Sequence, residues 1–182
     1  NLSTTESSIP IFTPSQPISS ISEATYSLNS LEEMETFNSD SRFTGFDGTG
    51  FTSVIIDTGI DVDHPFFGDD ADGDGISDRI VYQYDFAEND NDASDVNGHG
   101  SHVASIIGSS DETYSGIVPN ANLIALKVFQ DDGQGHFADL EKSLQWVVKN
   151  AETYNIANVN LSLGDEQNWN VAGSHYGIGD EL

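Results

Sequence analysis

Residues 54–61 read VIIDTGID, and this stretch indicates how the chain folds. Its first three residues are consecutive and β-branched, which is typical of a strand buried on both faces of a parallel sheet. The predicted strand covers residues 52–57 and ends at Asp57, so it places a carboxylate at its carboxyl end. Because ligands of parallel sheets gather at the carboxyl ends of the strands, Asp57 is a candidate functional residue.

A second stretch, NGHGSHVA at residues 97–104, places His99 between two glycines at the start of an apolar segment. The spacing of the apolar residues predicts a helix over residues 98–108. A neutral imidazole takes the proton of a nucleophilic serine, and a buried carboxylate orients that imidazole. Asp57 and His99 therefore supply two of the three groups of such a system. A helix start also disfavours the charged form of His99, which helps to keep it a base.

Strands and helices alternate along the rest of the chain. The further predicted strands cover residues 79–85, 122–128 and 158–162. Helical spacing of apolar residues predicts a second helix over residues 137–150. The alternation predicts an α/β fold in which a parallel sheet carries helices on both faces. Residues 1–30 are rich in Ser, Thr and Pro and are interpreted as a leader or linker, so the folded domain is expected over residues 31–182.

The chain is strongly acidic: 31 Asp and Glu residues against 5 Lys and Arg residues give a formal net charge of −26. This excess argues against a nucleic acid partner, because binding to phosphates needs basic side chains. The acidic groups also repel one another in a compact fold, and bound divalent cations are one expected means of compensation. The chain has no cysteine and no apolar run of the ~18 residues that a membrane helix needs. We therefore expect neither a disulfide framework nor a membrane partner.

Two other interpretations use the same residues. The sequence DTG at residues 57–59 also matches the triplet of aspartic proteases, which need two carboxylates that share one proton. The chain holds one such triplet, so a homodimer would have to supply the second, and His99 would then have no role. His99 and His102 have a spacing that is also found in zinc sites, although no third ligand is evident nearby.

A third motif, NLSLG at residues 160–164, completes a pattern. In order and spacing, the three motifs resemble those of the subtilisin-like serine proteases, and the resemblance covers residues 31–182. It implies a subtilisin-like fold, with Asp57 as the orienting carboxylate and His99 as the general base of an Asp-His-Ser triad. The family's oxyanion-hole Asn and its Gly-Thr-Ser-Met-Ala peptide do not occur here, so the fold is expected to be incomplete in this chain.

The resemblance also implies a partner for this chain. Half of a parallel sheet would leave an apolar strand edge bare, so we expect the carboxy-terminal half of the same protease as a separate chain that carries the serine. The expected activity is that of a calcium-assisted serine endopeptidase. The alternative is a catalytically inactive binding module with the same fold, in which the serine is replaced. Family resemblance and acidic composition together imply a secreted or periplasmic protein.

Two short segments are expected, again by resemblance, to bind a polypeptide substrate. They would pair with an extended peptide backbone from either side, a form of strand addition in which glycines let the peptide approach closely. The residues concerned are Gly133, Gln134, Gly135, Ser162, Leu163 and Gly164. Asp165 and Glu166 follow the second segment, and their charges are expected to favour arginine or lysine in the substrate.

An aspartate-rich stretch predicts a calcium site. Four carboxylates occupy positions 1, 3, 5 and 9 of a calcium-binding loop, and Gly75 stands at position 6, where the chain turns sharply. The candidate ligands are Asp70, Asp72, Asp74 and Asp78. Position 12, usually a bidentate acid, is Val81, so the match is incomplete. A second cluster of Asp90, Asp92 and Asp95 is a further candidate, and calcium there would order the loop before the catalytic histidine.

Overall fold

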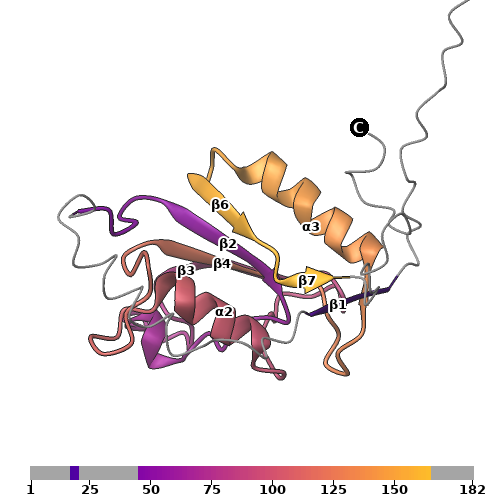
Figure 1. Ribbon diagram of the computed structural model, residues 1–182, viewed down its shortest axis with the longest axis horizontal. Helices are drawn as coiled ribbons and strands as arrows, with labels where there is room; N and C mark the ends of the chain where they lie inside the picture. The colour runs from indigo at the N-terminus through magenta and orange to yellow at the C-terminus, as the bar shows by residue number, and fades with distance from the viewer. Residues whose placement is uncertain (1–16, 21–44, 165–182) are drawn as a thin grey trace, which may run out of the picture.

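The computed structural model describes residues 17–20 and 45–164, and its centre is a four-stranded sheet (Figure 1). The strand order is β3-β4-β2-β6. The strands are β2 (Thr52–Asp57), β3 (Ile80–Asp85), β4 (Asn122–Lys127) and β6 (Ile156–Asn160). Every pairing in this sheet is parallel, as the consecutive apolar residues of β2 predict.

The register of the sheet aligns the carboxyl ends of three strands. Asp57 of β2 pairs with Lys127 of β4, which pairs on its other side with Asp85 of β3. All three residues are buried. Three charged residues therefore lie side by side at the sheet edge where a functional site is expected.

Helices cover both faces of the sheet (Figure 1). They are α2 (His99–Gly108) and α3 (Phe137–Asn150). Val103 of α2 lies in one buried cluster with Ile55 of β2, whereas Leu140 of α3 lies in the other with Val54. Successive side chains of a strand point to opposite faces, so the two clusters are the two faces of the sheet. The predicted α/β fold with helices on both faces is confirmed. No helix within residues 45–164 has the length and apolar character to cross a membrane.

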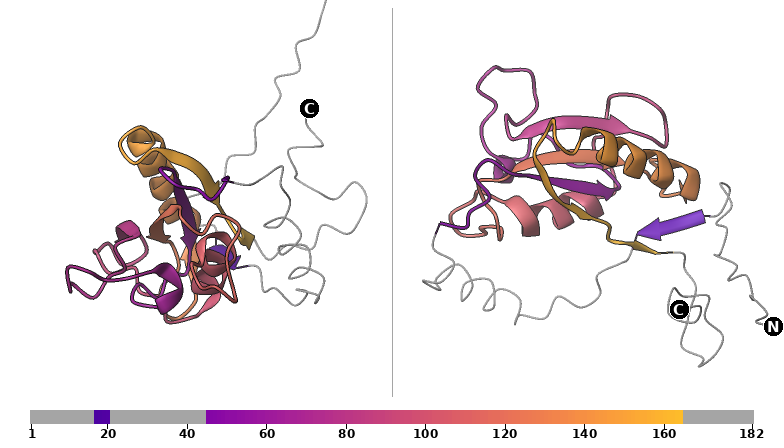
Figure 2. Two further views of the ribbon diagram at one scale, coloured as in Figure 1. Left: turned by 90° about the vertical axis from the view of Figure 1, so that its left-hand side faces the viewer. Right: turned by 90° about the horizontal axis from the view of Figure 1, so that it is seen from above.

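A smaller antiparallel sheet lies next to the carboxyl end of the parallel one. Its strand order is β5-β1-β7, and its members are β5 (Gly135–His136), β1 (Pro17–Ser20) and β7 (Leu163–Gly164). Figure 2 shows β1 alongside β7. The segment interpreted as a leader thus contains a strand that pairs with two distant parts of the chain. Its four residues, PISS, show no alternation of apolar and polar side chains that would predict a strand.

Several bounds differ from the prediction by one or two residues: β3 begins at Ile80, α2 begins at His99, and β4 ends at Lys127, where residues 79, 98 and 128 were expected. The strand expected over residues 158–162 is β6, which begins at Ile156 because this residue already pairs with Thr52. A short 3-10 helix, η1 (Pro65–Phe67), was not predicted.

Candidate active site

The candidate catalytic pair forms where β2 ends and α2 begins. His99 Nδ1 lies 2.7 Å from Asp57 Oδ1, although the two residues are 42 positions apart in the sequence. Asp57 is the last residue of β2 and its side chain is fully buried, whereas His99 opens α2 with one tenth of its side chain exposed. The structure therefore brings together the two side chains that the sequence singles out as orienting carboxylate and general base.

Burial and hydrogen bonding act in opposite directions on Asp57. Burial raises the pKa of this carboxyl, while hydrogen bonds from His99 and from the Thr58 amide lower it, and the net pKa is raised. An ionised carboxylate only accepts hydrogen bonds, so the N–H at Nδ1 of His99 donates a hydrogen bond to Asp57. In the neutral imidazole this leaves the lone pair on Nε2, the nitrogen from which a general base acts.

Gly100 lets α2 approach the end of β2. A Cβ at this position would lie 2.1 Å from the carbonyl oxygen of Gly59 and 3.2 Å from Asp57 Cβ. The first distance is far shorter than a van der Waals contact, so a side chain here would push the start of α2 outward. His99 would move with it, away from its carboxylate partner. The glycine that follows His99 is therefore required by packing.

The predicted peptide-binding segments lie on either side of β1. In β5, Gly135 pairs with Ile18, and in β7, Leu163 pairs with Ser20, both in antiparallel register. An extended stretch of this chain thus makes the backbone contacts that are predicted for a substrate. Gly133 and Gln134 lead into β5, and Ser162 leads into β7. Asp165 and Glu166 lie outside the described residues.

The exposed acidic loop, residues 69–78, brings three of its four predicted ligands together. One carboxylate oxygen from each of Asp70, Asp72 and Asp78 lies within 4.8 Å of the others, and all three residues are exposed. Asp74 is not in this group, and its carboxylate accepts a hydrogen bond from the Ile76 amide. Hydrogen bonds from backbone amides lower the pKa of Asp70, and the bond from the Gly75 amide has the largest effect. A lowered pKa favours the charged form of the carboxyl, which is the form that binds a cation.

The second aspartate cluster has a different arrangement. Asp90, Asp92 and Asp95 do not form a metal-like group within the described part of the chain, and neither do His99 and His102. The Asp92 carboxylate accepts hydrogen bonds from the next residue but one, within its own loop. Hydrogen bonds from protein donors hold this loop in the structure, and the expectation that calcium orders it stays a prediction.

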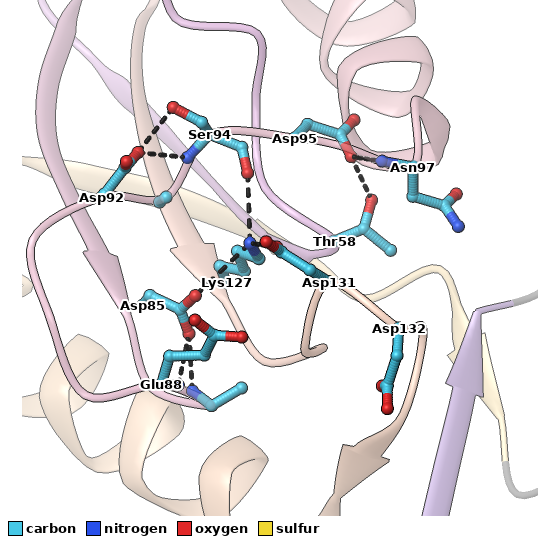
Figure 3. A network of polar contacts seen from close by, with 12 residues as sticks. Thr58, Asp85, Glu88, Asp92, Ser94, Asp95, Asn97, Lys127, Asp131 and Asp132 are labelled. Carbon is cyan, nitrogen blue, oxygen red and sulfur yellow. Dashed lines mark hydrogen bonds and ion pairs between the residues drawn. The ribbon is translucent and has the colours of Figure 1, made fainter.

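Lys127 was not identified from the sequence, yet it connects three loops at the sheet edge (Figure 3). Its ammonium lies 3.4 Å from Asp85 Oδ2, contacts the carboxylate of Asp131, and donates a hydrogen bond to the Ser94 carbonyl at 3.2 Å. Burial would lower the pKa of Lys127, but the two carboxylates outweigh this effect and raise it. A lysine that ends an apolar strand, in a chain with five basic residues, is the signal that was available.

The sequence and the fold were compared with those of known proteins. The sequence profile of the subtilase family, Peptidase S8, matches residues 48–178. Alkaline serine exoprotease A of Vibrio alginolyticus is 36% identical over 141 residues, which are 78% of this chain and 24% of that protein. Subtilisin-like protease 3 of Saccharomyces cerevisiae is 34% identical over 128 residues, which are 66% of this chain and 24% of that protein. The chain thus spans about a quarter of these curated relatives.

Among solved structures, the CspB protease of Clostridium perfringens has a similar fold. The TM-score is 0.57 at 19% sequence identity, and the match covers 71% of this chain and 33% of that protein. At this identity the likeness concerns the fold alone. It agrees with a parallel sheet that carries a helix on each face.

Proposed function

Because this chain belongs to the subtilase family, we propose that it supplies Asp57 and His99 to a serine endopeptidase. The observation that carries this proposal is the 2.7 Å contact between His99 Nδ1 and Asp57 Oδ1 at the carboxyl end of the sheet. A buried carboxylate in this position holds the imidazole in one tautomer and stabilises the imidazolium that forms during the reaction.

In the proposed mechanism, the neutral imidazole of His99 takes the proton of a serine hydroxyl as the serine attacks the peptide carbonyl. The protonated imidazole then donates this proton to the leaving amine, while Asp57 stabilises the positive charge and remains ionised. The serine is expected outside these 182 residues. That it lies on a companion chain with the carboxy-terminal half of the protease stays a prediction.

The substrate of this site is proposed to be an extended polypeptide. Its backbone would pair with β5 on one side and β7 on the other, and the antiparallel pairing of β1 in the same place supports this mode of binding. While β1 pairs with both edges, a second peptide has no free strand edge there. We therefore expect β1 to compete with the substrate.

Calcium is a separate part of the proposal. Asp70, Asp72 and Asp78 would hold the ion through carboxylate oxygens, the ligands that calcium prefers. The ion would offset part of the net charge of −26 and would restrict the exposed acidic loop. We also propose a secreted or periplasmic location, which the family and the acidic composition support.

Two alternatives remain distinguishable by experiment. An aspartic protease would require two DTG triplets, but the sequence holds one, and its carboxylate is occupied by an imidazole. A catalytically inactive relative would keep the same pair and the same peptide-binding edges without the serine. It would bind peptides, but it would not react with a fluorophosphonate.

The test is fluorophosphonate labelling and peptide hydrolysis by the intact protease that contains these residues. We expect labelling of a serine, no inhibition by pepstatin, and a loss of about 10⁴-fold in kcat for Asp57→Asn, because the imidazole then favours the wrong tautomer. Asp111→Asn is the matched control, since its carboxylate accepts hydrogen bonds from the amides of its own turn. Full activity of Asp57→Asn would overturn the proposed function.

A further inference from the structure

The carboxylate of Asp95 accepts hydrogen bonds at both of its oxygens. Oδ1 accepts from the Thr58 hydroxyl at 2.9 Å and from the amides of Asn97 and Gly98 at 3.0 and 2.9 Å. Oδ2 accepts from the amide and the hydroxyl of Ser101, at 2.8 and 2.6 Å. Figure 3 shows its contacts with Thr58 and Asn97, which join the segment after β2 to the loop before α2.

Thr58 completes this connection. Its hydroxyl donates to Asp95 and accepts a hydrogen bond from the Gly100 amide at 2.9 Å. Thr58 directly follows Asp57, and Gly100 directly follows His99. The connection therefore runs beside the contact between Asp57 and His99, one residue further along on each segment.

We propose that Asp95 is a positioning residue for the catalytic pair. It fixes the start of α2 against the end of β2, so that His99 stays within hydrogen-bond distance of Asp57. This inference rests on the proposed function, and Asp95 acts through the backbone of its neighbours. A displacement of about 1 Å in an active site lowers the rate by about 10²-fold, so small movements of this junction have large effects.

The charge state of Asp95 suits this role. Burial alone would raise its pKa, but hydrogen bonds from Ser101, Gly98 and Thr58 outweigh burial and lower it. The carboxylate therefore stays ionised at neutral pH and acts as an acceptor only. Both oxygens accept hydrogen bonds from protein donors, which join the loop before His99 to Thr58 and to the start of α2.

The test is Asp95→Asn in the intact protease. Asparagine keeps one acceptor oxygen and replaces the other by an amide that donates, so the contacts on the Thr58 side or on the Ser101 side are lost. We expect kcat to fall about 10²-fold and KM to change by less than about twofold. We also expect the low-field proton NMR signal of the hydrogen bond between His99 and Asp57 to shift or broaden.

Three further variants separate positioning from stability. Asp92→Asn is the matched control, because the Asp92 oxygen that accepts from the Ser94 amide and hydroxyl is retained in asparagine, and kcat should stay near wild type. Thr58→Val removes the connecting hydroxyl and should resemble Asp95→Asn, whereas Thr58→Ser keeps the hydroxyl and should retain kcat. All are measured at a temperature where urea titration shows the variant to be folded.

The outcomes distinguish this inference from the proposed function. An unchanged kcat and an unchanged His99 proton signal in Asp95→Asn would overturn the positioning role. Absence of fluorophosphonate labelling and hydrolysis in the wild-type protease would overturn the proposed function instead. In that case the proton signal alone decides whether Asp95 positions His99, since it requires no catalysis.

Discussion

The exposed acidic loop, residues 69–78, and the histidine loop, residues 85–98, are both rich in aspartate but use it differently. In the exposed acidic loop, Asp70 accepts hydrogen bonds from amides of its own segment, and the converging carboxylates face solvent. In the histidine loop, Asp85 lies against the buried ammonium of Lys127, and Asp95 contacts a hydroxyl 37 positions away.

The difference lies in the origin of the partners. A carboxylate whose hydrogen bonds come from its own loop stabilises a local turn, and in the exposed acidic loop Asp70 also converges with two other carboxylates. A carboxylate with partners on other elements holds those elements together, and in this chain they carry the candidate catalytic pair. Aspartate content alone does not distinguish the two loops, because the distant partners of Asp85 and Asp95 come close only when the strands pair.

Removal of Lys127 is expected to have the largest effect on stability. Lys127→Met preserves the length of the side chain but leaves buried Asp85 without its cation, and breaking a buried pair in this way costs about 3–5 kcal/mol. The measurement is urea unfolding of the intact protease. The pKa of Lys127 is raised above its ordinary value of 10.5, so its contribution is present below pH 10.5 and is lost as the pH rises beyond the raised value.

Lys142→Met is the matched control for this prediction. Lys142 also pairs with an aspartate, but 60% of its side chain is exposed. Exposed pairs contribute about 0.2–1 kcal/mol, so this variant should unfold near the wild-type urea concentration. Equal losses of stability in the two variants would show that the buried pair of Lys127 contributes no more to stability than the exposed pair of Lys142.

Gly100→Ala tests the junction between α2 and β2. In an exposed helix this change would stabilise by about 1 kcal/mol through helix propensity. Here the added Cβ would lie 2.1 Å from the Gly59 carbonyl oxygen, so we expect a destabilisation of about 1–3 kcal/mol and a loss of about 10²-fold in kcat. Urea unfolding and peptide hydrolysis measure the two effects.

Gly73→Ala in the exposed acidic loop provides the comparison. Its φ of +77° strains an alanine by about 1–2 kcal/mol, but an added Cβ would meet nothing within 4 Å. This variant should lose stability and keep kcat at saturating calcium. A loss of kcat as large as that of Gly100→Ala would contradict the assignment of the catalytic junction to the histidine loop.

The sequence predicts the elements whose apolar pattern is local. The β-branched run of β2 and the helical spacing of α3 give these elements their observed bounds, and the motif at residues 97–104 gives the start of α2. The position of Asp57 at the carboxyl end of a strand then predicts the edge of the sheet at which it meets His99.

Other features depend on pairings that the local sequence does not record. Lys127 becomes part of the network because the register places it between Asp57 and Asp85. Asp95 has the spacing of a cation ligand, but its partners come from residues on two separate elements. The pairing of β1 with β5 and β7 joins segments that are far apart in the sequence, so the composition of residues 1–30 gives no sign of it.

Calcium removal is expected to have a small effect on stability, and this effect belongs to the exposed acidic loop. If this loop binds calcium only in the folded state, ten times the Kd of calcium stabilises the protease by about 1.4 kcal/mol, and chelation lowers Tm by a few degrees. Asp70→Asn should abolish this dependence, because Asp70 provides one of the three converging carboxylates. Asp90→Asn in the histidine loop should leave it intact, since Asp90 does not belong to the group of converging carboxylates found among the described residues. A calcium-dependent Tm that survives Asp70→Asn and disappears in Asp90→Asn would reverse the roles of the two loops.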